Sequence, residues 1–233
     1  RLLALLETGN VSVRAAAARS LGRFRASNQQ AERTAQILAA LQKALRDPSL
    51  LVVAEATESL GAIGAPQAPV ILAELLRHPS EGVRQAAARA LEGIADERVL
   101  GEIWQALGDQ SAAVRFHVVG ALGRIGSQGT EERRAEVVAR LQTLLLQDGD
   151  PGVRSRAASL LGELGTAADL NFLWHRCQTT EDERVKVKAW SAMIEILVRS
   201  GNPDLVIQWD QLLANHRETA RRIEMLTEIR SRW

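Results

Sequence analysis

Aromatic residues and cysteine are scarce in this 233-residue sequence, which contains no tyrosine and a single cysteine, Cys177. One cysteine cannot build a disulfide framework or a cysteine-based metal cluster, and it fits a reducing, cytoplasmic location. No run of about 18 apolar residues occurs, so no segment is expected to span a membrane. An excess of either charge is lacking too, since 29 basic residues stand against 28 acidic ones. That balance argues against a general binder of nucleic acid or of anionic membranes.

Hydrophobic residues are plentiful, at 46% of the chain, and leucine, alanine and arginine dominate the composition. A chain of this length and apolar content can bury a large core. Its net charge of +1 is too low for a disordered polymer. Because leucine, alanine and arginine all favour helices, the composition alone indicates a helical protein.

One pattern recurs along most of the chain: a valine is followed by apolar residues four, eight and eleven positions later. At about 100° per residue these positions fall within an arc of roughly 90°, which is one face of an α-helix. Glycine often stands nine positions after the valine, where it would let a neighbouring backbone approach closely. The anchoring valines are Val13, Val52, Val83, Val114, Val153 and Val185, separated by 39, 31, 31, 39 and 32 residues.

Signals for the start of a helix precede most of these valines. Asp47, Pro48 and Ser49, for example, come just before Val52 and combine cap residues with a proline suited to a first helical turn. Another amphipathic segment lies upstream of each signal. Each repeat is therefore expected to be a helix, a tight turn and a second helix, followed by a short loop.

This pattern resembles the HEAT repeat family, in its short bacterial form related to the repeats of phycobilisome lyases. The resemblance covers nearly the whole chain, to about residue 200, and the core V-R-x-x-A-x-x-x-L-G recurs almost intact four times. It implies an all-α fold, a right-handed α-α superhelix (HEAT-repeat solenoid) of about six helix pairs plus a C-terminal closing pair.

The resemblance also implies a charge ladder, in which an aspartate in the turn of each repeat and a basic residue early in its second helix stack along the solenoid. The turn positions read Asp47, His78, Asp109, Asp148 and Thr180, and the basic positions read Arg14, Val53, Arg84, Arg115, Arg154 and Lys186. The ladder is interrupted at Val53 and His78, which predicts a local irregularity in the stack.

Two regions follow from the extent of the pattern. Residues 1–200 are predicted to be the repeat array, and residues 201–233 a degenerate helix pair that caps the same solenoid, since solenoid ends need a polar outer face. The other end begins at Arg1 inside an apolar helix. We therefore expect further repeats or another domain upstream of Arg1 in a larger protein.

No catalytic signature is present in the sequence. It lacks G-x-S-x-G, a P-loop, H-E-x-x-H and C-x-x-C, and its histidines have no spacing typical of metal ligands. Cys177 has no base beside it and is interpreted as a small buried hydrophobe. Trp104, Trp174 and Trp209 fall in line with apolar positions and are predicted core residues, whereas Trp190 is predicted to be half exposed. We expect no enzyme activity, no cofactor and no metal site.

The family resemblance places the second helices on the concave face, where a partner would bind. Outward positions on these helices alternate between basic and acidic, whereas a phosphate-binding groove should be uniformly basic. Phe116 lies at such a position beside Gly120 and is either a binding hot spot or a residue folded onto the adjacent repeat. The predicted partner-binding residues are Arg19, Arg23, Glu58, Arg89, Phe116, His117, Arg124 and Arg156.

These features predict a non-catalytic scaffold that binds a protein or peptide along its concave face. Two alternatives stay open. One is a nucleic-acid-binding or DNA-base-repair module, because HEAT-like DNA glycosylases share this architecture. The other is a bilin lyase or chaperone, because the short repeats resemble those of phycobilisome lyases.

Overall fold

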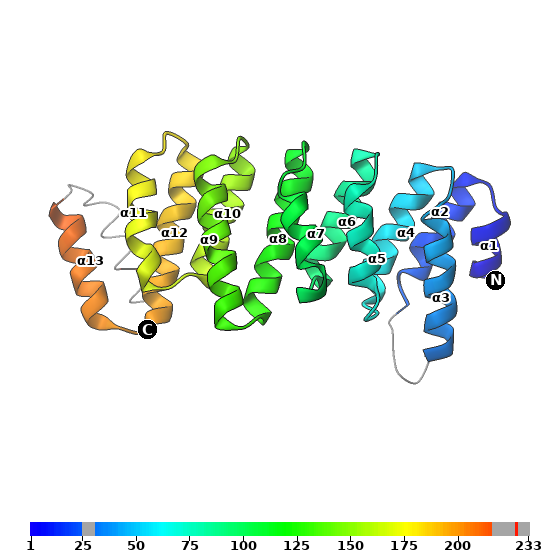
Figure 1. Ribbon diagram of the computed structural model, residues 1–233, viewed down its shortest axis with the longest axis horizontal. Helices are drawn as coiled ribbons and strands as arrows, with labels where there is room; N and C mark the ends of the chain where they lie inside the picture. The colour runs from blue at the N-terminus through cyan, green and yellow to red at the C-terminus, as the bar shows by residue number, and fades with distance from the viewer. Residues whose placement is uncertain (25–30, 216–226, 228–233) are drawn as a thin grey trace. The chain divides into compact units, whose positions relative to one another are not determined.

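The computed structural model describes residues 1–24, 31–215 and 227, and these residues form helices and no strand. The chain divides into two compact units, Arg1–Thr130 and Glu131–Trp233. Figure 1 shows the helix pairs of each unit following one another in chain order. The predicted repeat of paired helices is confirmed.

The described residues of the N-terminal unit form four helix pairs. Its elements are α1 (Leu2–Thr8), α2 (Val11–Leu21), α3 (Ala31–Ala44), α4 (Leu50–Ile63), α5 (Ala68–Glu74), the 3-10 helix η2 (Leu75–Arg77), α6 (Glu81–Ile94), the 3-10 helix η3 (Glu97–Val99), α7 (Leu100–Ala106) and α8 (Ala112–Gln128). The odd-numbered helices are the first helices of the repeats and the even-numbered ones are the second helices. Each of α2, α4 and α6 packs on the next second helix along the chain.

The C-terminal unit repeats this arrangement. Its elements are α9 (Glu131–Gln147), α10 (Pro151–Leu164), the 3-10 helix η4 (Ala167–Asp169), α11 (Leu170–Thr179), α12 (Glu183–Ser200) and α13 (Pro203–Asn215). The second helices α10 and α12 pack on each other, and each also packs on its own first helix. Of the predicted closing pair, α13 is present, and the second helix, which would follow residue 215, lies outside the described residues.

The predicted apolar arc forms the core between the repeats. The leucines eight positions after the anchoring valines are buried at every repeat that has one, and Leu60, Leu91, Leu122 and Leu161 are inaccessible to solvent. The glycine nine positions after the valine permits close helix packing, as predicted. A Cβ atom on Gly162 would lie 2.8 Å from the Cα of Ala192 on the next second helix.

Tryptophan reinforces the core of the C-terminal unit. The ring of Trp174 on α11 meets Trp190 on α12 at 5.6 Å and Trp209 on α13 at 6.3 Å, and both contacts are edge to face. Trp174 and Trp209 are buried, as predicted. The prediction that Trp190 is half exposed is wrong, because Trp174 packs against its ring and leaves it 6% exposed. Trp104, predicted in the core, is only partly buried.

Candidate functional site

Arginines early in the second helices bind turn aspartates of the following repeat, which confirms the predicted charge ladder at two rungs. The Arg14 guanidinium donates to both carboxylate oxygens of Asp47 at 2.7 and 2.8 Å. Arg84 does the same to Asp109 at 2.7 and 3.1 Å. The hydrogen bond from Arg14 is the main cause that lowers the pKa of Asp47. Burial raises the pKa of Asp109, but hydrogen bonds from Arg84 and from the Ser111 N–H more than offset it, so that this pKa lies below its usual range.

Each ladder arginine also closes its own turn. Arg84 donates to the backbone carbonyls of His78 and Pro79, and Arg154 donates to those of Asp148 and Gly149. These carbonyls stand just before the second helix, outside its hydrogen-bonded turns. The arginine therefore joins the turn of its own repeat to the turn of the next one.

The last rung differs from the prediction. Arg154 binds Asp182, at 3.1 Å, rather than the predicted Thr180. A threonine hydroxyl carries no charge, and here Thr180 accepts a hydrogen bond from the Asp182 N–H instead. Hydrogen bonds from the Val185 and Arg184 N–H groups, together with Arg154, lower the pKa of the Asp182 carboxyl.

The interruption at Val53 and His78 removes both members of one rung. Val53 holds the basic position of the repeat α3–α4, and His78 holds the turn position of the repeat α5–α6. His78 replaces the turn aspartate as a hydrogen-bond acceptor in the turn, because its Nδ1 accepts a hydrogen bond from the Ser80 N–H at 3.0 Å. Val53 is buried. Since neither residue brings a carboxylate or guanidinium, the missing rung leaves no half-buried charge without a partner.

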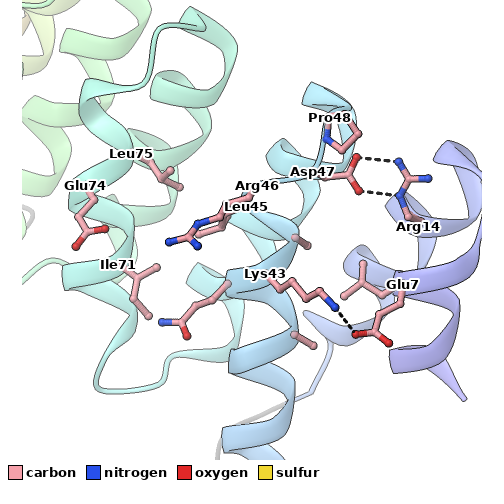
Figure 2. Close-up of a pocket in the computed structure, with 14 residues that line it drawn as sticks. Glu7, Arg14, Lys43, Leu45, Arg46, Asp47, Pro48, Ile71, Glu74 and Leu75 are labelled. Atoms are coloured by element: carbon pink, nitrogen blue, oxygen red, sulfur yellow. Dashed lines mark hydrogen bonds and ion pairs between the residues drawn. The ribbon is translucent and has the colours of Figure 1, made fainter.

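A cleft of about 980 Å³ opens at this same junction, on the side of the first helices. Its walls come from α1, from Arg14 of α2, from α3 with the turn that follows, and from α5 with η2 (Figure 2). The lining residues are Leu6, Glu7, Arg14, Ala40, Gln42, Lys43, Ala44, Leu45, Arg46, Asp47, Pro48, Ile71, Glu74 and Leu75. Nothing in the sequence pattern predicted this cleft beyond the irregular rung.

The outward face of the second helices carries a row of paired polar side chains in the N-terminal unit. Arg19 on α2 binds Glu55 on α4, with Nε to Oε2 at 2.9 Å. Arg89 on α6 binds Glu58 on α4. His117 on α8 binds Glu92 on α6 through Nδ1. The alternating signs predicted for this face are therefore matched between neighbouring repeats.

Two findings on the described residues bear on other kinds of site. No group of three or more histidine, cysteine, aspartate or glutamate side chains lies there in an arrangement that could hold a metal ion. No helix within the described ranges is long and apolar enough to cross a membrane.

A family model of HEAT repeats matches residues 1–92, 68–135 and 130–194. This chain belongs to the HEAT-repeat family. The predicted all-α HEAT solenoid is thereby confirmed. The charge ladder is the feature of these HEAT repeats that the sequence shows most directly. None of the curated proteins matches the chain.

Solved structures share the fold of this HEAT-repeat chain. YibA of Escherichia coli is 19% identical, with 98% of this chain and 81% of that chain covered at a TM-score of 0.62. A designed armadillo repeat protein in complex with the peptide (KR)4 is 22% identical, with 84% and 98% covered at a TM-score of 0.59. The complex of CpcE and CpcF of phycocyanin lyase from Nostoc sp. PCC7120 is 20% identical, with 100% and 93% covered. Its TM-score of 0.47 is too low to carry an argument about bilin chemistry.

Half of the predicted partner-binding residues lie in the paired row of the HEAT unit 1–130. Arg19, Glu58, Arg89 and His117 each contact a second helix of the next or preceding repeat. Their partners Glu55 and Glu92 are absent from the predicted set. Glu92 stands nine positions after Val83, where several other repeats have glycine, and that substitution was the available signal.

The remaining predicted residues are placed less uniformly. Phe116 is partly buried, and its ring meets His117 edge to face at 5.5 Å. Gly120 is buried, so the hollow expected beside Phe116 is not open to solvent. Arg23 is exposed and Arg124 is partly buried on α8. Arg156 is partly buried on α10, in the C-terminal unit.

Proposed function

We propose that this HEAT-repeat chain is a non-catalytic scaffold that binds a protein or peptide on the face of its second helices. The observation that carries the proposal is the matched row of side-chain pairs: Arg19 with Glu55, Arg89 with Glu58, and His117 with Glu92. The proposed binding residues are those predicted from the sequence, with Glu55 and Glu92 added.

The matched row supports a protein partner over a nucleic acid. A phosphate backbone is held by lysine and arginine side chains that release counterions on binding. Arg19 and Arg89 already have carboxylate partners on the neighbouring helix α4. A polyanion would have to displace Glu55 and Glu58 and would then lie against their charges, which is unfavourable.

The same row suits the rim of a protein interface. Polar and charged groups that are already paired lose little when a partner shields them, and aromatic residues near the centre supply apolar contact area. Phe116 and His117 occupy adjacent positions on α8 at one end of the row. The designed armadillo repeat protein that holds (KR)4 supports a peptide or protein as the class of partner. The balance of charge on this face favours a partner of mixed charge.

The non-catalytic part of the proposal rests on the sequence, which carries no catalytic motif. Stacked helical repeats of this kind create extended surfaces suited to binding, which is consistent with the proposal.

The test is affinity capture with the full chain from a lysate of the organism that carries it, with and without nuclease treatment, read by mass spectrometry. Three variants are compared with the original chain: Arg89→Glu and Phe116→Ser on the second-helix face, and Arg46→Glu in the cleft as a control with the same change of charge as Arg89→Glu. We expect a discrete protein that is lost with the first two variants and retained with the third. Thermal unfolding followed by circular dichroism checks that all three variants fold.

Two results would contradict the proposal. Capture that disappears on nuclease treatment would favour the nucleic-acid alternative. A protein captured equally well by Arg89→Glu, Phe116→Ser and the original chain would remove the second-helix face as its binding surface.

A further inference from the structure

The cleft lies where two neighbouring first helices, α3 and α5, make little contact with each other. The helix α3 has 14 residues and packs on α1, α2 and α4, whereas α5 has 7 residues and packs on α4, α6 and α7. First helices elsewhere in this unit do touch the next one, as α1 touches α3 and α5 touches α7. The cleft therefore lies beside a weak helix-to-helix contact, and it also borders the intact rung Arg14–Asp47 of the preceding junction.

Seven of the fourteen residues that line the cleft are apolar. Leu6 and Ala44 are buried beneath it, while Leu45, Ile71 and Leu75 are only partly buried and keep apolar surface facing the opening. Figure 2 shows Ile71 and Leu75 on the side of α5 and η2, opposite the end of α3. A volume of about 980 Å³ is at the upper end of the range typical of binding pockets.

The charges around the cleft are balanced but not all are paired. Arg14 binds Asp47, and Lys43 binds Glu7 at 2.8 Å. All residues that line the cleft lie in the described part of the chain. Of the charged ones, Arg46 and Glu74 take no part in these ion pairs. Both are exposed, and Figure 2 shows Arg46 extending from the end of α3 toward α5, on which Glu74 lies. The cleft thus presents a cation from one wall and an anion from the other.

We propose that this cleft binds an amphipathic helical peptide whose apolar stripe carries an acidic residue along one edge and a basic residue along the other. The apolar stripe would cover Leu45, Ile71 and Leu75, as in the helix-in-groove mode of recognition. The acidic edge faces Arg46 and the basic edge faces Glu74. This surface lies on the first-helix side and does not depend on the second-helix face.

A helix fits this place better than an extended strand because every neighbouring element is a helix and none offers a strand edge. Helices that pack fully do so by fitting ridges into grooves at about 8–10 Å, and α3 and α5 make little such contact. The opposite charges also fix the direction of the peptide, since reversing the helix in the cleft would place like charges together.

The test is selection of 16-residue peptides from a displayed library on the immobilised full chain. The library fixes leucines at positions i, i+3, i+4 and i+7 and randomises the residues on both flanks. We expect enrichment of peptides with acidic residues on one flank and basic residues on the other. Selection on Arg46→Glu, which makes both walls acidic, should instead enrich basic residues on both flanks.

Synthetic peptides from the first selection then give the affinities. Arg46→Glu should weaken their binding about fivefold or more, as expected when an exposed charge pair is replaced by repulsion. Ile71→Ala should weaken it as well, through lost apolar contact. Arg89→Glu, with the same charge change on the second-helix face, should leave it unchanged.

Three outcomes would overturn the proposal: no enrichment, flanks with no charge preference, or peptides that bind Arg46→Glu and Ile71→Ala as well as the original chain. Peptides weakened only by Arg89→Glu would place their site on the second-helix face, which would support the proposed function and reject the cleft. The two proposals therefore fail separately.

Discussion

Two neighbouring junctions of the N-terminal unit share one repeat pattern and differ in their polar contacts. Where the repeat α5–α6 meets α7–α8, Arg84 reaches Asp109 across the junction. Where α3–α4 meets α5–α6, Val53 and His78 hold those positions. The core leucines of the two repeats, Leu60 and Leu91, are nevertheless buried to the same degree.

The comparison separates two tasks within a HEAT repeat. The apolar face of the second helices holds successive repeats together at both junctions, since α4 packs on α6 as α6 packs on α8. The ladder joins the turns and is dispensable at one junction. Its absence coincides with the separation of α3 and α5 and with the cleft. A junction without a rung can thus gain a binding surface while keeping its core.

The prediction with the largest expected effect tests whether the apolar core contributes equally to stability at the two junctions. Leu60→Ala and Leu91→Ala each remove a side chain that is 0% exposed and leave a cavity. Each should lower the free energy of unfolding by about 2–5 kcal/mol. Urea denaturation followed by circular dichroism measures both. A loss below about 1 kcal/mol for Leu60→Ala alone would show that the irregular junction has a weaker core.

The second prediction concerns how much the Arg84–Asp109 rung contributes to the free energy of unfolding. Asp109→Ala leaves the Arg84 guanidinium, whose side chain is 17% exposed, without its carboxylate, and should cost about 2 kcal/mol. His78→Ala removes one neutral hydrogen bond to the Ser80 N–H and should cost less than about 1 kcal/mol. The same denaturation experiment compares them. Equal losses would mean that the charge pair adds nothing to the turn.

At acidic pH, the free energies of unfolding of Asp109→Ala and of the original chain should become more similar. The pKa of Asp109 is lowered in the folded state, so its contribution to stability is complete above the unfolded pKa of about 3.9. It is lost as the pH falls through the lower, folded-state pKa. Denaturation at pH 5.5 and at pH 3 should show the effect of Asp109→Ala shrinking at the lower pH. If the difference in the free energy of unfolding stays constant with pH, the loss in Asp109→Ala is due to packing and not to the charge of the carboxylate.

Periodic features of this fold were predictable from the sequence, and contacts between repeats were only partly so. The buried leucines and the pairs Arg14–Asp47 and Arg84–Asp109 follow from positions that recur in every repeat. Residue spacing within one helix defines its apolar face whatever its neighbours do. The HEAT resemblance then supplied the connection between one turn and the next.

What was missed depends on the register between helices. The pairing of Arg19 with Glu55 requires the rotation and offset of α2 against α4, which no single-helix pattern contains. Trp190 was misjudged because Trp174, from the preceding helix, covers it. The cleft lies between helices of unequal length, α3 and α5, that make little contact with each other. In the sequence, Val53 and His78 indicated where the stack of repeats is irregular, but they did not predict the shape of the cleft.

The smallest effect comes from rebuilding the missing rung. Val53→Arg alone places a guanidinium at a position that is 2% exposed, opposite a histidine, and should destabilise the chain by about 1–2 kcal/mol. His78→Asp alone keeps the acceptor for the Ser80 N–H and should change little. The double variant should recover about 1 kcal/mol relative to the sum of the single changes, as a double-mutant cycle measures.

That coupling energy determines whether the ladder and the cleft exclude each other. If the new rung forms, the turns of the two repeats are tied together as they are by Arg84 and Asp109. Peptides selected on the original chain should then bind the double variant more weakly, although Arg46 and Glu74 are unchanged. A favourable coupling energy with unaltered peptide affinity would mean that the rung and the cleft are independent, and that the short helix α5 alone keeps the cleft open.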